Sequence, residues 1–305
     1  MLAHQAVAPS ELTGSWSLEP ALLATLGLTV LLHRRGTARL GRRIASHSLH
    51  ARSRTERKRR ALAFYGGILV LAAALVSPLD ALASTLFSGH MVQHLLLMLV
   101  AAPLLVHARP AAALVAGLPA GGRRAARGAR GDLWRRAARA AANPLAVWTV
   151  GTVALWAWHL PLLYEAALSH DALHVVEHAS FLGAALLFWA VVLGSGARRG
   201  VPRPVAMLLV FATSVQSSAL GIVLLLAPNV LYPIHGAGAR LWDVSPLGDQ
   251  HVAGGLMWGP PAFLYVVVIG WLLVRWFAEM EDASPDTGQV AAGLASPARG
   301  GGGPA

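Results

Sequence analysis

The sequence predicts an all-α membrane protein, a bundle of about seven transmembrane helices with the N-terminus outside and the C-terminus inside. Three observations lead to this fold class. The chain of 305 residues is 55% hydrophobic and only 13% charged, about half the charged fraction of soluble domains. Seven apolar runs approach the roughly 20 residues that a membrane-crossing helix needs. Arginine and lysine are concentrated in alternate connections between these runs.

The predicted spans are apolar runs bounded by charged or turn-forming residues. The first and fourth runs are shorter than the others. We expect one membrane domain over residues 18–280, an extracytoplasmic N-terminal arm at 1–17, and a disordered tail at 281–305 that is rich in Gly, Ala and Pro. The spans cover residues 18–33, 61–79, 88–107, 144–160, 172–195, 204–228 and 251–277.

The distribution of basic residues predicts the orientation. The connections 34–60, 108–143 and 196–203 are rich in arginine, whereas the intervening connections contain Arg240 as their one arginine or lysine. Basic loops face the cytoplasm by the positive-inside rule. We therefore attribute much of the net charge of +11 to topology and to contact of the basic cytoplasmic loops with anionic lipids, and we expect no nucleic-acid partner.

Several classes of chemistry are excluded by the residues that the chain lacks. It has no cysteine, which rules out disulfides, thiolate metal sites, iron–sulfur clusters and covalently attached haem. It also has no GxSxG, HExxH, Walker or dinucleotide-binding motif. We therefore expect no catalytic residues and no enzymatic activity.

The third predicted span opens with a stripe of histidine and methionine. His90, His94 and Met98 are spaced four residues apart and share a helix face, with Met91 beside them. Imidazole nitrogen together with thioether sulfur is a donor set that suits copper, particularly Cu(I). The alternative is a pair of interfacial histidines with methionines that pack in the core.

The fifth predicted span repeats this arrangement at its outer end. His174 and His178 share a face, and His170 lies one turn earlier. Glu177 lies among them, where a carboxylate could orient a ligand histidine, pair with a histidinium or relay protons. The alternative here is a solvated polar face that lines a cavity.

Further polar residues lie at the same predicted membrane level. Asp80 ends the second span, His159 ends the fourth, and Asp249 and His251 open the seventh. Two histidine pairs on different spans at one depth indicate a metal site more strongly than either pair would alone. We take His90, His94, His174, His178, Met91 and Met98 as candidate copper ligands, and Asp80, His159, His170, Glu177, Asp249 and His251 as orienting groups or further ligands.

Three other interpretations remain open. A membrane cytochrome would use histidines on facing spans as axial ligands of haem b. A copper or proton-coupled transporter would need a polar path across the bilayer, whereas these histidines are confined to the outer third. A purely structural scaffold would use the same residues for packing alone.

Three segments resemble a known family. Residues 87–98 (FSGHMVQHLLLM), 174–182 (HVVEHASFL) and 249–258 (DQHVAGGLMW) resemble the multi-span CtaG-type cytochrome c oxidase assembly factors of bacteria. The resemblance implies a seven-span protein of the bacterial cytoplasmic membrane that helps to mature a haem–copper oxidase. It also implies oxidase subunits as partners and a role in supplying or inserting copper.

Overall fold

The computed structural model describes residues 6–44, 51–128, 143–196 and 201–283. Within these ranges the chain forms helices and no strand, which confirms the all-α prediction. The helices, in chain order, are α1 (Pro20–Ile44), α2 (Ala51–Leu75), α3 (Pro78–Thr85), α4 (Phe87–Leu95), the π-helix η2 (Leu96–Ala101), α5 (Ala102–Ala108), α6 (Ala111–Gly117), α7 (Ala120–Gly128), α9 (Pro144–Trp158), α10 (Pro161–Ser169), α11 (Asp171–Gly194), α12 (Arg203–Leu225), α13 (Gly236–Leu241) and α14 (Pro246–Ala283), with short 3-10 turns η1 (Leu12–Gly14) and η3 (Pro233–His235).

Four to six of these helices meet the length and hydropathy of a membrane span, so the chain is a membrane protein. The four single spans are the continuous helix Phe87–Ala108, α11, α12 and α14. Two bent pairs, α2 with α3 and α9 with α10, bring the number to six if each pair is one span. Their bends of 47° and 77° each come before a proline at the start of the second helix, where the residue before proline disfavours helical geometry.

The first predicted span differs from the other six. It forms the N-terminal part of α1, which is not among the candidate spans in the described chain. Arg34 and Arg35 end the apolar stretch of this helix, and charge lowers its mean hydropathy. The count of seven and the orientation therefore stay predictions.

Several predicted loops contain helix. Residues 34–44 belong to α1 and residues 51–60 to α2, while the connection 108–143 contains α6 and α7. Arginine favours helix nearly as much as leucine does, so a basic stretch can extend a membrane helix beyond its apolar part. The predicted tail begins inside α14, and its residues 284–305 lie outside the described part, as do 45–50, 129–142 and 197–200.

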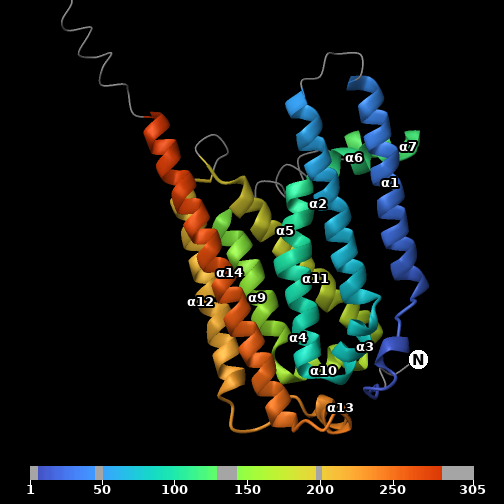
Figure 1. The fold of residues 1–305 in the computed structure, drawn as a ribbon, viewed down its shortest axis with the longest axis vertical. Helices are drawn as coiled ribbons and strands as arrows, with labels where there is room; N and C mark the ends of the chain where they lie inside the picture. The colour runs from blue at the N-terminus through green and yellow to red at the C-terminus, as the bar shows by residue number, and fades with distance from the viewer. Residues whose placement is uncertain (1–5, 45–50, 129–142, 197–200, 284–305) are drawn as a thin grey trace, which may run out of the picture.

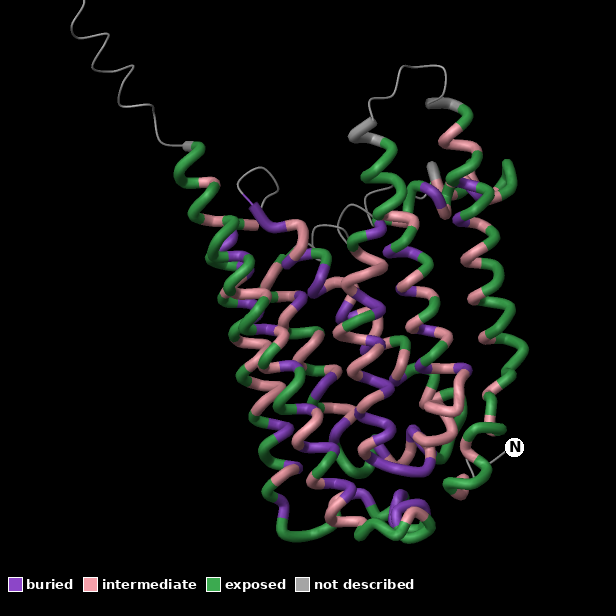
Figure 2. The backbone as a smooth tube through the Cα atoms, in the orientation of Figure 1, coloured by how far each residue is buried: buried purple, intermediate pink, exposed green. Residues whose placement is uncertain are grey.

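The bundle has two ends of different character (Figure 1). One, here called the arginine end, carries α6 and α7 beside the arginine-rich parts of α1 and α2. The other, the histidine end, carries α3, α10 and α13, and α4 and α11 both start there. Figure 2 shows that much of the backbone near the histidine end is buried.

Small residues allow α12 and α14 to pack closely along their length. A Cβ added at Gly254 of α14 would lie 2.6 Å from the carbonyl oxygen of Gly221 in α12. A Cβ at Gly221 would lie 2.9 Å from the carbonyl oxygen of Gly254. Glycines at such crossings let membrane helices approach through van der Waals contact of their backbones.

A π-helical turn interrupts the continuous helix that carries the third predicted span. Residues Leu96–Ala101 form this turn, directly after α4. Pro103 follows it and has no N–H for the carbonyl of Leu99, so the regular α pattern cannot continue through this point. The Trp189 indole donates to the carbonyl oxygen of Met98 at 2.8 Å and thereby satisfies one of the displaced backbone groups.

Candidate metal centre

A buried carboxylate fixes the start of α4, the helix that carries His90 and His94. Asp249 Oδ2 accepts a hydrogen bond from the Phe87 amide at 2.7 Å, and Oδ1 accepts one from the Ser88 amide at 3.1 Å. The first amides of a helix have no partner within it, and the helix dipole favours negative charge there. Asp249 of α14 therefore acts as a cap supplied by another helix.

The opposite side of α4 is held by an amide. Gln93 Nε2 donates to Asp80 Oδ1 and to the carbonyl oxygen of Ala74, both at 2.8 Å. Gln93 is fully buried, and these bonds connect α4 to α2 and α3. The two contacts, with Asp249 on α14 and with Asp80 on α3, fix both the axial position and the rotation of α4.

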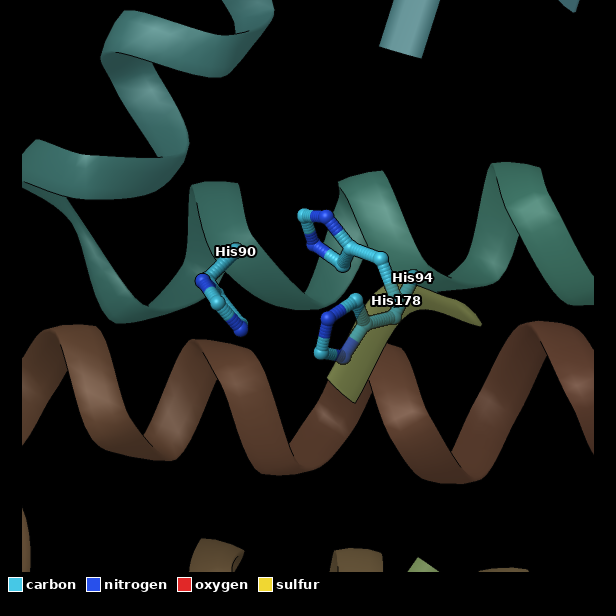
Figure 3. Close-up of side chains that lie close together, drawn as sticks. All are labelled: His90, His94 and His178. Atoms are coloured by element: carbon cyan, nitrogen blue, oxygen red, sulfur yellow. The ribbon is translucent and has the colours of Figure 1, made fainter. Parts of the chain in front are cut away.

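Four imidazoles meet between α4 and α11. The ring centroids of His90 and His94 are 4.2 Å apart, and those of His174 and His178 are also 4.2 Å apart. Across the two helices, His90 lies 5.7 Å from His174, and His94 lies 5.1 Å from His178. Figure 3 shows three of these rings close together. The structure thus brings together the four histidines that the sequence proposed as ligands.

A carboxylate lies at the centre of this group. Glu177 Oε1 is 3.6 Å from His90 Nε2 and 3.8 Å from His94 Nε2. The Glu177 side chain is 1% exposed, and ionised carboxylates are rarely buried this deeply without a partner. Its position is that of a possible ligand as well as an orienting group. We define the histidine cluster as His90, His94, His174, His178 and Glu177.

Aromatic rings enclose the cluster. The His94 ring lies 4.7 Å from Phe181, and the His90 ring lies 5.2 Å from Tyr164. The Tyr164 hydroxyl is 2.7 Å from His235 Nε2. This shell keeps His90 and His94 out of water, at 0% and 2% exposure.

His235 and Tyr164 are site neighbours that the sequence did not single out. His235 lies in η3, in the connection between α12 and α14, and its ring is 6.3 Å from that of His90. Burial lowers the pKa of His235 to about 4, because the charged imidazolium loses its hydration. His235 is not three or four residues from any other histidine of the site, so no helical periodicity in the sequence links it to them. The one signal in the sequence is its place in the connection between the sixth and seventh predicted spans, which faces the same side as the other cluster histidines.

The methionines pack in the apolar core. Met91 is buried in a cluster with Phe87, Tyr164 and Tyr232. Met98 lies two turns from Met91, packs between two core clusters, and its carbonyl accepts the Trp189 bond. Both methionines contact apolar side chains, and copper binding by their sulfurs stays a prediction.

The remaining candidate residues make local contacts. His159 ends α9, and its Nδ1 lies 2.7 Å from the Leu155 carbonyl oxygen. His170 is exposed at the start of α11, and its Nδ1 lies 3.0 Å from the carbonyl oxygen of Ala166. His251 Nε2 lies 3.0 Å from the carbonyl oxygen of Ala227. For these three, the contacts are with backbone carbonyls of the same or a neighbouring segment.

The donor set of the histidine cluster suits a transition-metal ion. His90, His94 and His178 offer three nitrogens within 4.8 Å of one another, and His90, His174 and Glu177 form a second such group. Neither nitrogen of His94 has a hydrogen-bond partner among the described residues, and the same holds for Glu177 Oε2. Buried polar atoms without partners are costly. A bound cation would take up one nitrogen of His94 and an oxygen of Glu177, and neutral imidazole is a ligand for copper and zinc.

Comparison with known proteins gives a family match over nearly the whole chain. The family model described as cytochrome c oxidase caa3 assembly factor (Caa3_CtaG) matches residues 21–279, a range that contains the histidine cluster. Two uncharacterized proteins, from Mycobacterium bovis and Mycobacterium tuberculosis, are each 26% identical over 224 residues. The alignment covers 71% of this chain but 34% of each relative, so the chain spans about a third of the length of these curated relatives. No solved structure gives a significant match.

Proposed function

Because the chain belongs to the cytochrome c oxidase caa3 assembly factor family, we propose that it binds copper in the histidine cluster and delivers it to an oxidase subunit. The family match confirms the resemblance and supports a role in cytochrome c oxidase assembly. Copper as cargo, the oxidase subunit as recipient and the bacterial cytoplasmic membrane as location belong to the proposal. The role requires binding and ligand exchange, without turnover.

One observation carries the proposal: three imidazoles from two different helices offer donor atoms within 4.8 Å of one another. Histidines that served only in packing would not need to converge. Each buried imidazole would instead need a hydrogen-bond partner of its own. His94 has none among the described residues. A copper ion would bind one nitrogen of each neutral imidazole and so give these buried rings a common partner.

The surroundings favour a small ion over haem. A haem with two axial histidines needs a flat slot between the two ligand rings. Here the facing rings of His94 and His178 are 5.1 Å apart, and those of His90 and His174 are 5.7 Å apart. Tyr164 and Phe181 pack against these rings, which leaves no flat slot between the facing histidines. Purified protein should therefore be colourless, and a Soret band would favour the cytochrome instead.

The environment inward of the cluster argues against a transporter. Met98 and Leu155, together with Phe181, lie in apolar core clusters next to the histidines. An ion that crossed the membrane here would exchange imidazole ligands for a mostly apolar environment, at high cost in a low-dielectric interior. Delivery from the same end of the bundle at which the ion enters requires no such path.

The test is complementation of a strain that lacks this protein. The wild-type chain should restore copper in the purified terminal oxidase, and a His94→Ala/His178→Ala variant should leave the oxidase with its haem but depleted of copper. His251→Ala is the matched control, because His251 lies at the same end and bonds the Ala227 carbonyl. Normal oxidase copper with the double variant would favour a purely structural scaffold.

A further inference from the structure

The histidine cluster contains two ligand sets that share one residue. The first joins His90 with His94 and His178, and the second joins His90 with His174 and Glu177. We infer that copper has two alternative positions, both held by His90, and moves between them by exchange of the other two ligands. This inference rests on the proposed copper function and adds to it how the ion moves through the site.

The two sets lie at different depths. Helices α4 and α11 both start at the histidine end, with Phe87 and Asp171 as their first residues. His90 and His174 therefore lie in the first turn, and His94 and His178 lie one turn, about 6 Å, further in. Glu177 directly precedes His178 and lies in the same turn, so His174 alone makes its set the outer position. The set with His94 and His178 is the inner one.

The covering of the His94 ring agrees with this order, although each set joins two buried ligands with one half-buried histidine, His174 in the outer set and His178 in the inner one. His94 is 2% exposed, and its ring is covered by Phe181. His174 is only partly buried, in the turn that begins α11. An ion that arrives from outside the bundle reaches the outer position before the inner one.

The positions overlap too closely for two ions. Glu177 Oε1 is within 3.8 Å of a nitrogen of both His90 and His94, so the one carboxylate borders both positions. Two cations held a few ångströms apart in a low-dielectric interior would repel each other strongly. The site therefore holds one ion at a time.

Sharing His90 gives the ion a continuous path. In the step inward, the bonds from His174 nitrogen and Glu177 oxygen to copper break, bonds from His94 and His178 nitrogens form, and the His90 bond is retained. All imidazoles stay neutral, Glu177 stays ionised and no electron moves. The ion is never released into the apolar interior, where a bare charge is very costly.

The donors predict a preference for oxidation state. The outer set contains a carboxylate, and oxygen donors suit harder ions. The inner set contains three imidazoles and no charged donor, which suits Cu(I) better. We therefore expect the inner set to contribute more to Cu(I) binding than the outer one.

Two alternative positions give a distinctive pattern of affinities. The observed association constant of one ion is the sum of the constants of the two positions, so the stronger position supplies at least half of it. Loss of the weaker position then raises the dissociation constant by about twofold at most. A single site that used all five groups at once would instead be weakened by every substitution.

The experiment measures Cu(I) affinity and stoichiometry of the full-length protein in detergent, with a chromogenic Cu(I) chelator as competitor. The variants are His94→Asn, His174→Asn, the double variant and His90→Asn, with His251→Asn as the matched control. We expect one ion per chain, a change of about twofold or less for His174→Asn, a larger loss for His94→Asn, and at least a hundredfold loss for both the double variant and His90→Asn.

Three results would overturn the inference. They are two ions per chain, a loss in both single variants as large as in the double variant, and full affinity in the double variant. Circular dichroism checks the fold, and His178→Asn replaces His94→Asn if the latter unfolds, because it removes the same set. Absence of copper binding in the wild type, or full affinity in His90→Asn, would instead reject the proposed function itself.

Discussion

Replacement of Asp249 by asparagine tests whether this carboxylate builds the site through the backbone of α4. Asp249 is 3% exposed and accepts the amides of Phe87 and Ser88 at 2.7 and 3.1 Å. Hydrogen bonds to a charged group contribute about 1.5–3 kcal/mol each. Asparagine keeps one acceptor oxygen, loses the charge and directs an amide donor toward a backbone donor. We therefore expect the free energy of unfolding of the metal-free protein to fall by about 2 kcal/mol.

The assay is unfolding of the metal-free protein in mixed micelles, followed by tryptophan fluorescence. Asp243→Asn is the control, because Asp243 is exposed in the connection that precedes α14 and has a positive φ of 54°, which asparagine tolerates well. If Asp249 were only a metal ligand, removal of a buried charge would leave the metal-free protein equally stable or more stable. Equal stability of Asp249→Asn and the wild type would refute the capping role.

Four further predictions follow from individual contacts. Between pH 6.5 and 4 the unfolded chain protonates His235, while the folded chain keeps it neutral. The free energy of unfolding should therefore be highest above pH 6.5 and fall by about 3 kcal/mol toward pH 4. His235→Asn should flatten this part of the stability profile, and an unchanged profile would contradict the burial argument. Gly254→Ala should separate α12 from α14 and lower the unfolding free energy by more than about 2 kcal/mol, because the new Cβ would lie 2.5 Å from the Leu225 nitrogen. In the control Gly255→Ala, the new Cβ meets nothing within 4 Å and stability should not change. Equal effects of the two substitutions would reject the close crossing. Trp189→Phe should lose the bond to the Met98 carbonyl and about 1–2 kcal/mol, while Trp271→Phe, at a site 42% exposed, should change little. Copper affinity should decrease as the pH falls and the ligand histidines take up protons, and an affinity that stays constant from pH 7 down to the acid unfolding of the protein would contradict imidazole ligands.

The sequence predicted the helices and the main part of the site for a common reason. Both depend on a local period: apolar runs of membrane length for the helices, and a spacing of four residues for His90 with His94 and for His174 with His178. The common depth of the two pairs could be predicted, whereas their convergence on each other is a contact between distant segments that the structure shows. Such depth is readable from the order of the spans.

What the sequence did not predict depends on contacts between distant segments. Asp249 looked like a site carboxylate, but it caps α4, a helix that precedes it by 162 residues. Asp80 likewise bonds Gln93, whose role has no helical signature. His235 reaches the cluster through a turn in an irregular connection, and no periodicity marks such a position. The charge pattern also predicted that the first helix ends at residue 33, whereas α1 continues through the arginine-rich stretch to Ile44.

X-ray absorption spectroscopy of the copper-loaded protein tests the central claim most directly. Copper held by the histidine cluster should show scattering from imidazole rings, three for the set of His90, His94 and His178, and this signal should disappear in a His90→Ala/His94→Ala variant that still folds. Copper without imidazole ligands, or an identical spectrum in that variant, would show that the ion is bound elsewhere.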